Sequence, residues 1–479
     1  MSVERRIVIN GLFWKFSERI LAQGVAFVLS IVLARMLLPE EYGIVALVLI
    51  FINLANVFVT SGFGDALVQK QNSDDKDFST MFICSVVMSL VLYGILFLIA
   101  PGIAKFYENK KLIAVIRILS LQILLGGVKT IQHAYVTKKM MFKKFFFSTL
   151  GGTLISGVVG IILAYNDFGV WALVAQYLTN STIDMTVLFF TVPWRPHFYF
   201  DKIEAKKMFS YGWKLTVAQF LNMLYSNLRN LFIGKIYTEA DLAFFNKGDQ
   251  FPNIIINNVN TSISTVLFPA MAKENGDIQR LRQMTRKSMR MSAYLIFPMM
   301  VGLIAVSQPL VRLLLTEKWL PCVPFLCISC VYWMFQPCQT ANAQVIKALG
   351  ESGIYLELET LKKIVGILLL IFSIKYGVLA IAVSNVVLAG FSMIVNILPN
   401  RHLIDYGIRD QIKDLSPALM LSTVMGTLVF IEQKLILPDW QMLLLQAGTG
   451  VSVYLLLSKI FHIEEFEYLL KMIKSRIKK

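Results

Sequence analysis

The chain has 479 residues, 56% of them hydrophobic, and its mean hydropathy is +0.64. Soluble domains hold about 45–50% apolar residues even with glycine counted, so the composition excludes an ordinary soluble protein and indicates a polytopic helical membrane protein. The net charge of +16 is scattered over many short segments. It forms no single basic patch, so we expect no nucleic-acid partner.

Apolar runs recur along the whole chain, and each is long enough to cross a bilayer, for which about 20 residues suffice. The N-terminal stretch MSVERRIVINGLFWKF has no small-residue cleavage site, so we expect no removable signal peptide. We therefore expect an all-α fold with about 14 transmembrane helices. The expected spans are about 10–34, 42–64, 79–104, 112–134, 146–165, 168–192, 208–236, 242–271, 291–315, 321–347, 355–375, 377–399, 415–433 and 440–461.

Lys and Arg are distributed unequally between the two alternating sets of loops. One set holds most of them, including Lys138, Lys139, Lys143, Lys144 and the basic C-terminal tail. Cytoplasmic loops carry the Lys/Arg excess, and an even number of spans puts both termini on one side. We therefore expect cytoplasmic N- and C-termini, with anionic headgroups of the membrane lipids attracted to the same side.

The sequence also repeats itself at an offset of about 200 residues. WKFSERILAQ (14–23) aligns with WKLTVAQFLN (213–222), and ARMLLPEEYG (34–43) with GKIYTEADLA (234–243). HAYVTK (133–138) aligns with NAQVIK (342–347), and FGVWALV (168–174) with YGVLAIA (376–382). The four matches keep the same order and the same place within their spans.

Six spans separate the two copies, and an even number makes them parallel repeats related by a pseudo-two-fold axis along the membrane normal. We expect an N-terminal lobe of six helices at 1–205 and a C-terminal lobe of six helices at 206–400. Two additional helices and a basic cytoplasmic tail occupy 401–479. In transporters built in this way, the substrate path lies between the lobes.

The seventh expected span is unusually polar. Residues 213–235 read WKLTVAQFLNMLYSNLRNLFIGK. At about 100° per residue, the polar side chains fall on one half of the helix and the leucines on the other. Ionisable groups inside a span almost always face the bundle interior or a water-filled cavity, so we expect this helix to line a cavity.

Spans 1, 2 and 8 carry polar faces as well, and span 10 and the end of span 9 add further candidates. We expect a cationic set of cavity residues, consisting of Lys15, Arg19, Lys214, Arg229, Lys247 and Arg312. The neutral polar set consists of Gln23, Asn53, Asn56, Gln219, Asn222, Tyr225, Asn253, Asn257, Gln336 and Gln339. Amides and tyrosines suit sugar hydroxyls and ring faces, while Lys and Arg suit phosphates.

Each of these assignments has a structural alternative. Lys214 and Arg312 lie near span ends, where a long side chain reaches the interface by snorkelling. Arg229 and Asp249 can each pair with a neighbouring side chain. Asn and Ser residues also serve as hydrogen-bonding contacts between helices.

Prolines lie late in several spans. Pro337 should interrupt span 10 and free a backbone carbonyl, and Pro101 and Pro309 occupy matching places in the two repeats. Such breaks serve either the bending that alternating access needs or the packing of neighbouring helices.

Motifs for catalysis and cofactor binding are missing from the sequence. Cys327 and Cys330 form a single CxxC inside an apolar span without a nearby His, which favours small apolar fillers over a metal or redox site. There is no Walker loop, dinucleotide fingerprint or HExxH. We expect a transporter without enzymatic activity, without a cofactor and without a metal site.

Several segments resemble bacterial polysaccharide flippases of the Wzx type, in the multidrug/oligosaccharidyl-lipid/polysaccharide exporter superfamily. They are ARMLLPEEYGIVALVLIFINLANVFVTSGFGDALVQK (34–70), FGVWALVAQ (168–176), SYGWKL (210–215), NLRNLFIGKIYTEADLAFFNKGDQFP (227–252) and VLFPAMAK (266–273). The chain looks closer to exporters of lipopolysaccharide or teichuronic acid than to drug exporters. Many relatives have Asp where this chain has Arg229, so a carboxylate role is not carried over to that position.

The resemblance implies a cargo, an oligosaccharide repeat unit on undecaprenyl pyrophosphate, moved across the bacterial cytoplasmic (inner) membrane. It also implies a polysaccharide polymerase and export machinery as partners, and coupling to H+ or Na+, which is common in the superfamily. The candidate coupling carboxylates are Glu18, Asp65 and Asp249. The alternatives are a multidrug antiporter of the same superfamily and a lipid II-type flippase.

Overall fold

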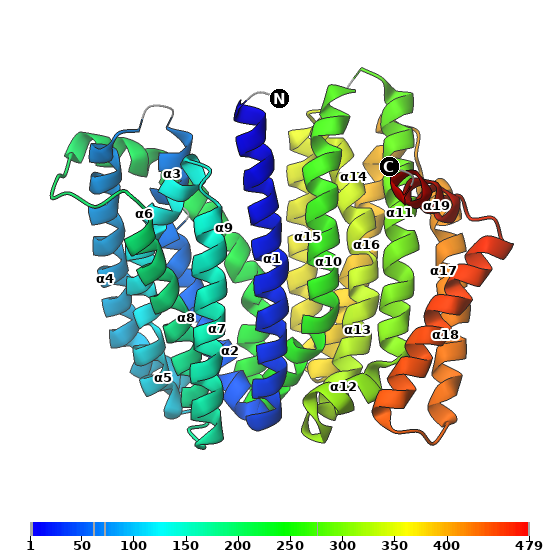
Figure 1. Cartoon of the computed structure of the whole chain (residues 1–479), viewed down its shortest axis with the longest axis horizontal. Helices are drawn as coiled ribbons and strands as arrows, with labels where there is room; N and C mark the ends of the chain where they lie inside the picture. Colours follow the sequence, from blue (N-terminus) through cyan, green and yellow to red (C-terminus); the bar gives the residue numbers. More distant parts are fainter. Residues whose placement is uncertain (1–2, 61–62, 71–72, 275, 478–479) are drawn as a thin grey trace. The chain divides into compact units, whose positions relative to one another are not determined.

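The computed structural model describes residues 3–60, 63–70, 73–274 and 276–477, and all regular structure in these ranges is helical (Figure 1). The predicted all-α fold is confirmed. Contacts between Cα atoms divide the chain into two compact units, residues 1–243 and residues 244–479.

Unit 1 contains nine helices within its described residues. They are α1 (Val3–Met36), α2 (Pro39–Thr60), α3 (Phe63–Gln69), α4 (Asp75–Phe106), α5 (Lys111–Leu119), α6 (Leu121–Lys138), α7 (Lys143–Tyr165), α8 (Val170–Thr191) and α9 (Lys202–Ile236).

The next helix begins at the end of unit 1, and the rest belong to unit 2. They are α10 (Glu239–Lys273), α11 (Ile278–Ala305), α12 (Ser307–Leu315), the 3-10 helix η1 (Glu317–Cys322), α13 (Val323–Met334), α14 (Gln336–Ala348), α15 (Ser352–Ser373), α16 (Val378–Leu403), α17 (Ile408–Ile431), the 3-10 helix η2 (Glu432–Lys434), α18 (Asp439–Ile460) and α19 (Glu464–Ile477).

Each expected span coincides with one helix or with two or three consecutive ones. In the described part of the chain, nine segments, each made of one to three consecutive helices, are long and apolar enough to cross a membrane. The polar helices α9 and α10 are not among them, because their many amide and charged groups lower their mean hydropathy. The count of 14 crossings therefore stays a prediction.

Helix α9 packs against α2, α3 and α4 of unit 1. The contacts thus group α9 with unit 1, whereas the sequence repeat assigns 206–236 to the C-terminal lobe. The two divisions describe different properties, packing in one case and internal similarity in the other. The lobe boundaries at 205 and 400 stay predictions.

The helices themselves follow the repeat. Helices α2 and α10 begin at Pro39 and Glu239, and helices α8 and α16 begin at Val170 and Val378. The residue before each of the latter two helices is a glycine with a left-handed backbone, Gly169 with φ +56° and Gly377 with φ +99°. Residues other than glycine adopt this region at a cost, so both copies need glycine at the same point.

The expected interruption at Pro337 is present. Helix α13 ends at Met334 and α14 begins at Gln336, directly before Pro337, while Pro309 lies in the first turn of α12, which follows the end of α11 at Ala305 and the intervening Val306. Pro101 instead lies inside the continuous helix α4. The break in span 10 is confirmed, and the two repeats differ at the Pro101 position.

Aspartates cap the N-termini of three helices. Asp74 accepts from the backbone N–H of Asp77 at the start of α4, with the reciprocal bond also present. Asp201 accepts from the second and third N–H groups of α9, and Asp277 accepts from Arg280 N–H at α11. Such caps satisfy N–H groups that a helix leaves without partners and typically contribute about 1 kcal/mol each.

A glycine lets the start of α2 approach the start of α10. A Cβ on Gly43 would lie 1.9 Å from the backbone oxygen of Glu239. The neighbouring Glu41 accepts from Leu38 N–H at 2.8 Å and lies against Gly169. Two residues of the segment PEEYG (39–43), Glu41 and Gly43, therefore serve close backbone packing inside unit 1.

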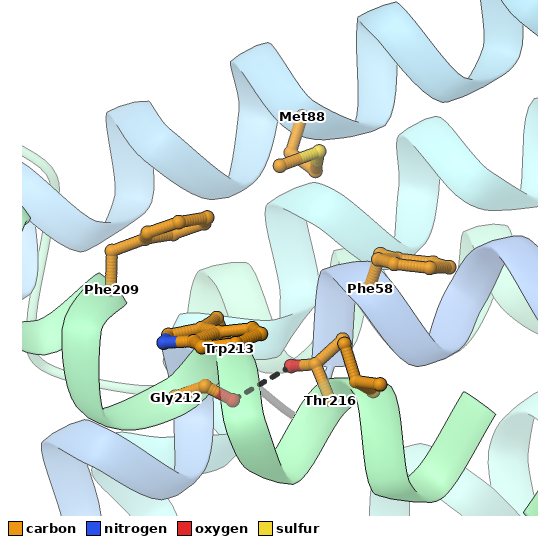
Figure 2. A pocket seen from close by; sticks show the side chains of 7 residues that line it. Phe58, Met88, Phe209, Gly212, Trp213 and Thr216 are labelled. Carbon is orange, nitrogen blue, oxygen red and sulfur yellow. Dashed lines mark hydrogen bonds between the residues drawn. The ribbon is translucent and has the colours of Figure 1, made fainter. Parts of the chain in front are cut away.

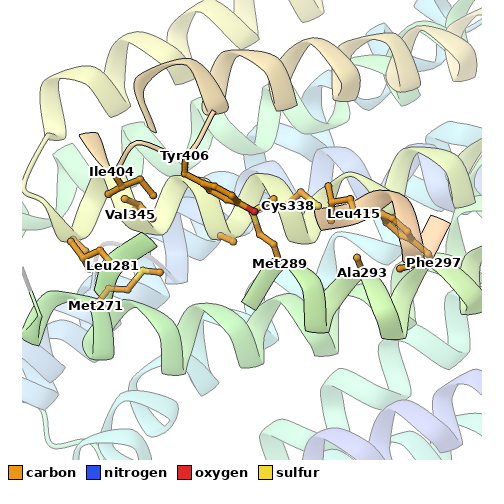
Figure 3. Packing of buried hydrophobic residues seen from close by; sticks show 13 residues of the cluster. Met271, Leu281, Met289, Ala293, Phe297, Cys338, Val345, Ile404, Tyr406 and Leu415 are labelled. Carbon is orange, nitrogen blue, oxygen red and sulfur yellow. The ribbon is translucent and has the colours of Figure 1, made fainter. Parts of the chain in front are cut away.

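The core of unit 2 is built from α10, α11, α14 and α17, together with the α16–α17 connection. Figure 3 shows the Tyr406 ring pointing towards Cys338 and Met289, with Leu415 and Phe297 further along the same cluster. The Tyr406 hydroxyl donates to Asp414 at 2.9 Å, and Arg286 binds the same carboxylate through two bonds of 2.7 Å. Burial and the bond to Asp414 raise the pKa of Tyr406, which keeps its hydroxyl protonated as a donor.

The C-terminal tail forms the helix α19 instead of an irregular segment. Arg290 of α11 binds Glu464 at 3.0 Å and Glu465 at 2.6 Å, and Lys287 lies 4.3 Å from the centre of the Tyr468 ring. Phe466 of α19 lines an apolar pocket of about 810 Å³ together with residues of α11, α17 and α18. The tail is thus held to unit 2 by charge and by apolar packing.

Gly43→Ala tests the close approach of α2 and α10. The added methyl group would overlap the Glu239 backbone, and overpacking of this kind typically costs about 1–3 kcal/mol. We expect a lower melting temperature of the purified protein in detergent. Gly94→Ala is the matched control, because a Cβ there meets nothing within 4 Å; an equal effect of the two substitutions would contradict the explanation.

Candidate functional site

The polar side of α9 is largely accessible. Lys214, Gln219 and Asn222 are exposed, while Tyr225 and Arg229 are half-buried. These five residues lie on one half of the helix, as the helical spacing requires. The structure does not test whether they contact a cargo, so their assignment to a substrate cavity stays a prediction.

The opposite side of α9 packs on α2. The ring of Phe220 lies 5.2 Å from that of Phe58, centre to centre. Leu221, on the same side, remains 56% exposed. The apolar side of α9 therefore contacts protein over only part of its width.

The candidates on α1 and α2 are distributed around two helices. Gln23 and Asn53 are exposed, and Asn56 points its side-chain oxygen towards Gly126 of α6. Glu18 accepts from the Thr149 hydroxyl of α7 at 3.3 Å. This bond gives Glu18 a structural contact, and its coupling role stays a prediction.

Three candidates lie outside the part of the chain whose side chains the structure describes. Lys15 and Arg19 belong to α1, and Asp65 belongs to α3. Their assignments remain predictions.

In unit 2, α10 carries a ladder of polar side chains at four-residue spacing. Asp249 accepts from the Trp333 indole N–H of α13 at 2.7 Å and from Asn253 at 3.2 Å. Asn257 in turn donates to Asn253. The structure thus brings three predicted site residues together and adds Trp333, which the sequence analysis did not single out.

Lys247 is the most buried of the predicted cations whose side chains are described. Its side chain is only 5% exposed, and its ammonium lies 5.7 Å from the centre of the Trp319 ring. A cation over an indole face is attracted by the ring quadrupole. Lys247 therefore lies inside unit 2 instead of reaching an interface.

Arg312 has a structural partner. It lies 3.4 Å from Asp439 in the first turn of α18 and 4.0 Å from Glu317. The ion pair with Asp439 links α12 to α18, consistent with the contacts between the two helices. A cargo role for Arg312 stays a prediction, but a structural role already accounts for its charge.

The two glutamines of α14 make different contacts. Gln336 donates to the Tyr332 hydroxyl at 3.4 Å, across the break before α14, and Gln339 donates to the Ala389 carbonyl of α16 at 3.1 Å. One turn further, Asn342 exchanges hydrogen bonds with Gln411 and accepts from Asn400 at 2.7 Å. This network is fully buried and joins α14, α16 and α17.

An ionic cluster in unit 1 was missed in the sequence. Lys129 of α6 lies 2.9 Å from Asp184 of α8, and His133, one turn from Lys129, lies 3.8 Å from the same carboxylate. Next to them, the fully buried Gln132 has no hydrogen-bond partner for either amide atom among the described residues. The signal was available, since expected spans 4 and 6 each carry ionisable residues.

The described residues contain no group of three or more His, Cys, Asp or Glu side chains that could hold a metal ion. Cys327 is half-buried and lies 3.5 Å from the Ser307 hydroxyl, and Cys330 is buried. Their packing is that of small apolar residues.

The comparisons with known proteins agree with each other. The family model described as "Polysaccharide biosynthesis protein" matches residues 32–324. The teichuronic acid biosynthesis protein TuaB of Bacillus subtilis (strain 168) is 26% identical over 309 residues, which cover 63% of this chain and 62% of that relative, just under two thirds of its length.

Two further relatives are covered more completely. The succinoglycan biosynthesis transport protein ExoT of Rhizobium meliloti (strain 1021) is 24% identical over 74% of this chain and 72% of its own. The lipopolysaccharide biosynthesis protein WzxC of Escherichia coli (strain K12) is 24% identical over 82% of both chains.

Solved structures show the same fold. The lipid II flippase MurJ, in an inward closed conformation, has a TM-score of 0.74 at 18% identity and covers 95% of this chain and 99% of its own. An inward-facing multidrug resistance transporter of the MATE family has a TM-score of 0.64 at 14% identity, over 81% of this chain and 98% of its own.

Breaking the Lys129–Asp184 ion pair tests how much it contributes to the stability of the fold. Asp184→Asn leaves the half-buried Lys129 ammonium without its partner. The loss of one partner costs about 3–5 kcal/mol in a fully buried pair and less in a half-buried one, whereas removing both charges is often close to neutral. We expect Asp184→Asn to lower the melting temperature in detergent and the double variant Lys129→Met/Asp184→Asn to restore most of it. The exposed Asp167→Asn serves as a control for the loss of one negative charge, and a double variant less stable than the single one would refute the pairing.

Proposed function

The chain belongs to the family of polysaccharide biosynthesis proteins that includes the Wzx-type flippases of the multidrug/oligosaccharidyl-lipid/polysaccharide exporter superfamily, and we propose a cargo and a mechanism for it. The proposed cargo is an oligosaccharide repeat unit on undecaprenyl pyrophosphate. The protein moves it from the inner to the outer leaflet by alternating access, driven by a cation gradient. The cargo serves surface polysaccharide export.

The observation that carries this proposal is the density of amide side chains in helices of a membrane protein. Gln219 and Asn222 are exposed on α9. Asn253 and Asn257 belong to the separate ladder of polar side chains on α10. An amide offers donors and an acceptor together, which matches the hydroxyl groups of a glycan. A purely apolar cargo would gain nothing from these groups.

Cationic groups support the anionic part of the cargo. Lys214 is exposed on the same half of α9 as Arg229, and Lys247 is buried in unit 2. Charge-assisted hydrogen bonds from Lys and Arg to phosphate oxygens are stronger than neutral ones and offset the desolvation of both groups. An exporter of cationic drugs would be served better by carboxylates, so the multidrug alternative is less well supported.

Among the candidate coupling carboxylates, Asp249 has the best-defined surroundings. It accepts from Trp333 and Asn253, so its position is fixed by neutral donors, and none of the described Lys, Arg or His side chains forms an ion pair with it. A half-buried carboxylate without a cationic partner can exchange a proton or Na+ as part of a transport cycle. We propose Asp249 as the coupling residue.

The alternative nearest in chemistry is a lipid II-type flippase, because lipid II also joins a pyrophosphate to a polyprenyl chain and sugars. The two proposals differ only in the glycan. The same proposal treats the chain as a transporter without enzymatic activity in the bacterial cytoplasmic membrane, with both termini on the cytoplasmic side, as the distribution of Lys and Arg predicts.

Lys214→Ala/Arg229→Ala tests the cationic contribution. With the purified protein in liposomes, we expect the movement of a polyprenyl-pyrophosphate oligosaccharide to the lectin-accessible leaflet to slow at least tenfold, because two phosphate contacts are lost. The matched control is Lys235→Ala on the same helix, whose ammonium lies 2.8 Å from the exposed carboxylate of Glu108. Unchanged transport by the double variant, at equal protein content, would refute the proposal that Lys214 and Arg229 bind the phosphates of the cargo.

Asp249→Asn tests the coupling. We expect the variant to move cargo at a rate that no longer responds to an imposed pH or Na+ gradient, because the amide cannot exchange a cation. Asp241→Asn is the control on the same helix, since Asp241 accepts hydrogen bonds from Thr238 at the start of α10 and has a capping role there. A gradient response retained by Asp249→Asn would exclude this residue and leave the cargo assignment standing.

A further inference from the structure

An apolar pocket of about 330 Å³ lies inside unit 1 where α2, α4 and α9 meet (Figure 2). Phe58 of α2 and Met88 of α4 face Phe209 and Trp213 of α9 across it. Thr216 also lines the pocket, but its hydroxyl donates to the Gly212 carbonyl at 3.0 Å and so offers no free donor. The lining is therefore suited to hydrocarbon.

The pocket is open on the α9 side. Phe209 is 52% exposed and Trp213 46% exposed, although both are large apolar side chains. In a bilayer such exposed rings contact lipid hydrocarbon, and the apolar hollow between them is large enough to enclose part of an acyl chain. From Phe209 to Val217 the lined stretch of α9 extends about 12 Å at 1.5 Å per residue.

Two lysines continue the same side of α9 towards its N-terminus. Lys202, Lys206, Phe209 and Trp213 follow one another at spacings of four, three and four residues, which places them on one face of the helix. Both lysine side chains are exposed, and neither takes part in an ion pair among the described residues.

The carboxylates next to Lys202 and Lys206 in the sequence bind other groups. Glu204 binds Lys207 at 2.8 Å and Lys70 at 3.0 Å, and these bonds lower the pKa of Glu204. Asp201 accepts from the backbone N–H groups that begin α9. Neither Lys202 nor Lys206 therefore forms an ion pair with these carboxylates.

We propose that this surface binds an anionic phospholipid of the cytoplasmic leaflet, with its phosphate at Lys202 and Lys206 and one acyl chain in the pocket. On the predicted topology, α9 begins at the cytoplasmic surface, so the two lysines lie at headgroup depth and the pocket lies directly below. Basic residues beside an apolar hollow on the cytoplasmic side are suited to anionic lipids.

This site is separate from the proposed cargo contacts. Around the helix axis, the centre of the pocket face lies about 150° from the centre of the polar face that carries Lys214 and Asn222. A phospholipid also fits the short pocket better than a long polyprenyl chain, of which only a small part would be enclosed. The inference does not depend on the proposed function.

Quenching of tryptophan fluorescence tests the proposal on the full-length protein in nanodiscs. The probes are phosphatidylglycerol and phosphatidylcholine with brominated acyl chains, and the Trp213 signal is the difference between the protein and its Trp213→Phe variant. We expect half-maximal quenching of Trp213 at a roughly tenfold lower mole fraction of phosphatidylglycerol, because each lysine near the headgroup contributes to anionic selectivity.

Lys202→Ala/Lys206→Ala should abolish this preference while leaving quenching by phosphatidylcholine unchanged, and Lys202→Glu/Lys206→Glu should reverse it. Lys110→Ala/Lys111→Ala removes the same charge elsewhere in unit 1 and should keep the preference. Both lysines of the site are exposed, so these variants should fold, and their elution and melting temperature are compared with the parent protein.

Three results would overturn the proposal. The first is equal quenching of Trp213 by both lipids, and the second is a preference that survives in Lys202→Ala/Lys206→Ala. The third is displacement of phosphatidylglycerol from Trp213 by a small molar fraction of polyprenyl phosphate, which would make the cargo lipid the occupant. The transport experiments on Lys214, Arg229 and Asp249 test the proposed function and do not bear on the quenching of Trp213 by lipid.

Discussion

The structure depends on one constraint, that a polar group within hydrocarbon must find a partner or reach water. Helices satisfy the backbone, and the side chains must be satisfied one by one. In unit 1, Lys129 and Asp184 neutralise each other, and in unit 2 Asn342 binds both Gln411 and Asn400 in a buried network. Polar side chains with such partners hold helices together. The polar residues on the exposed half of α9 are the ones that we propose to contact the cargo.

The helices were predictable because hydropathy and charge act along the chain. The positions of all expected spans coincide with helices, and Pro337 interrupts its span as its chemistry requires. The repeat was also readable, and Gly169 and Gly377 show it again in the backbone. The sequence did not reveal α19 as a helix, since its acidic first turn and basic remainder resemble a solvated tail.

The pairing of side chains was less predictable, because it depends on which helix faces which. Arg312 was predicted as a cavity residue, and its contact with Asp439, 127 positions later in the chain, could not be predicted from the sequence. Trp333 went unnoticed because an indole in an apolar span carries no signal until Asp249 is known to lie 2.7 Å away. The ionisable residues Lys129 and Asp184 were visible in their spans, but neither lies in the helices with the densest polar faces, so the pair was missed.

The attachment of α19 affects how membrane topology can be mapped. Arg290 holds Glu464 and Glu465, and Phe466 closes part of an apolar pocket formed with α18. A reporter domain fused directly after α18 would remove these contacts and uncover the hydrocarbon surface that α19 protects. A reporter at the C-terminus leaves the helix in place. The side on which such a reporter is found would then describe the intact protein and not a truncated one with a newly exposed apolar face.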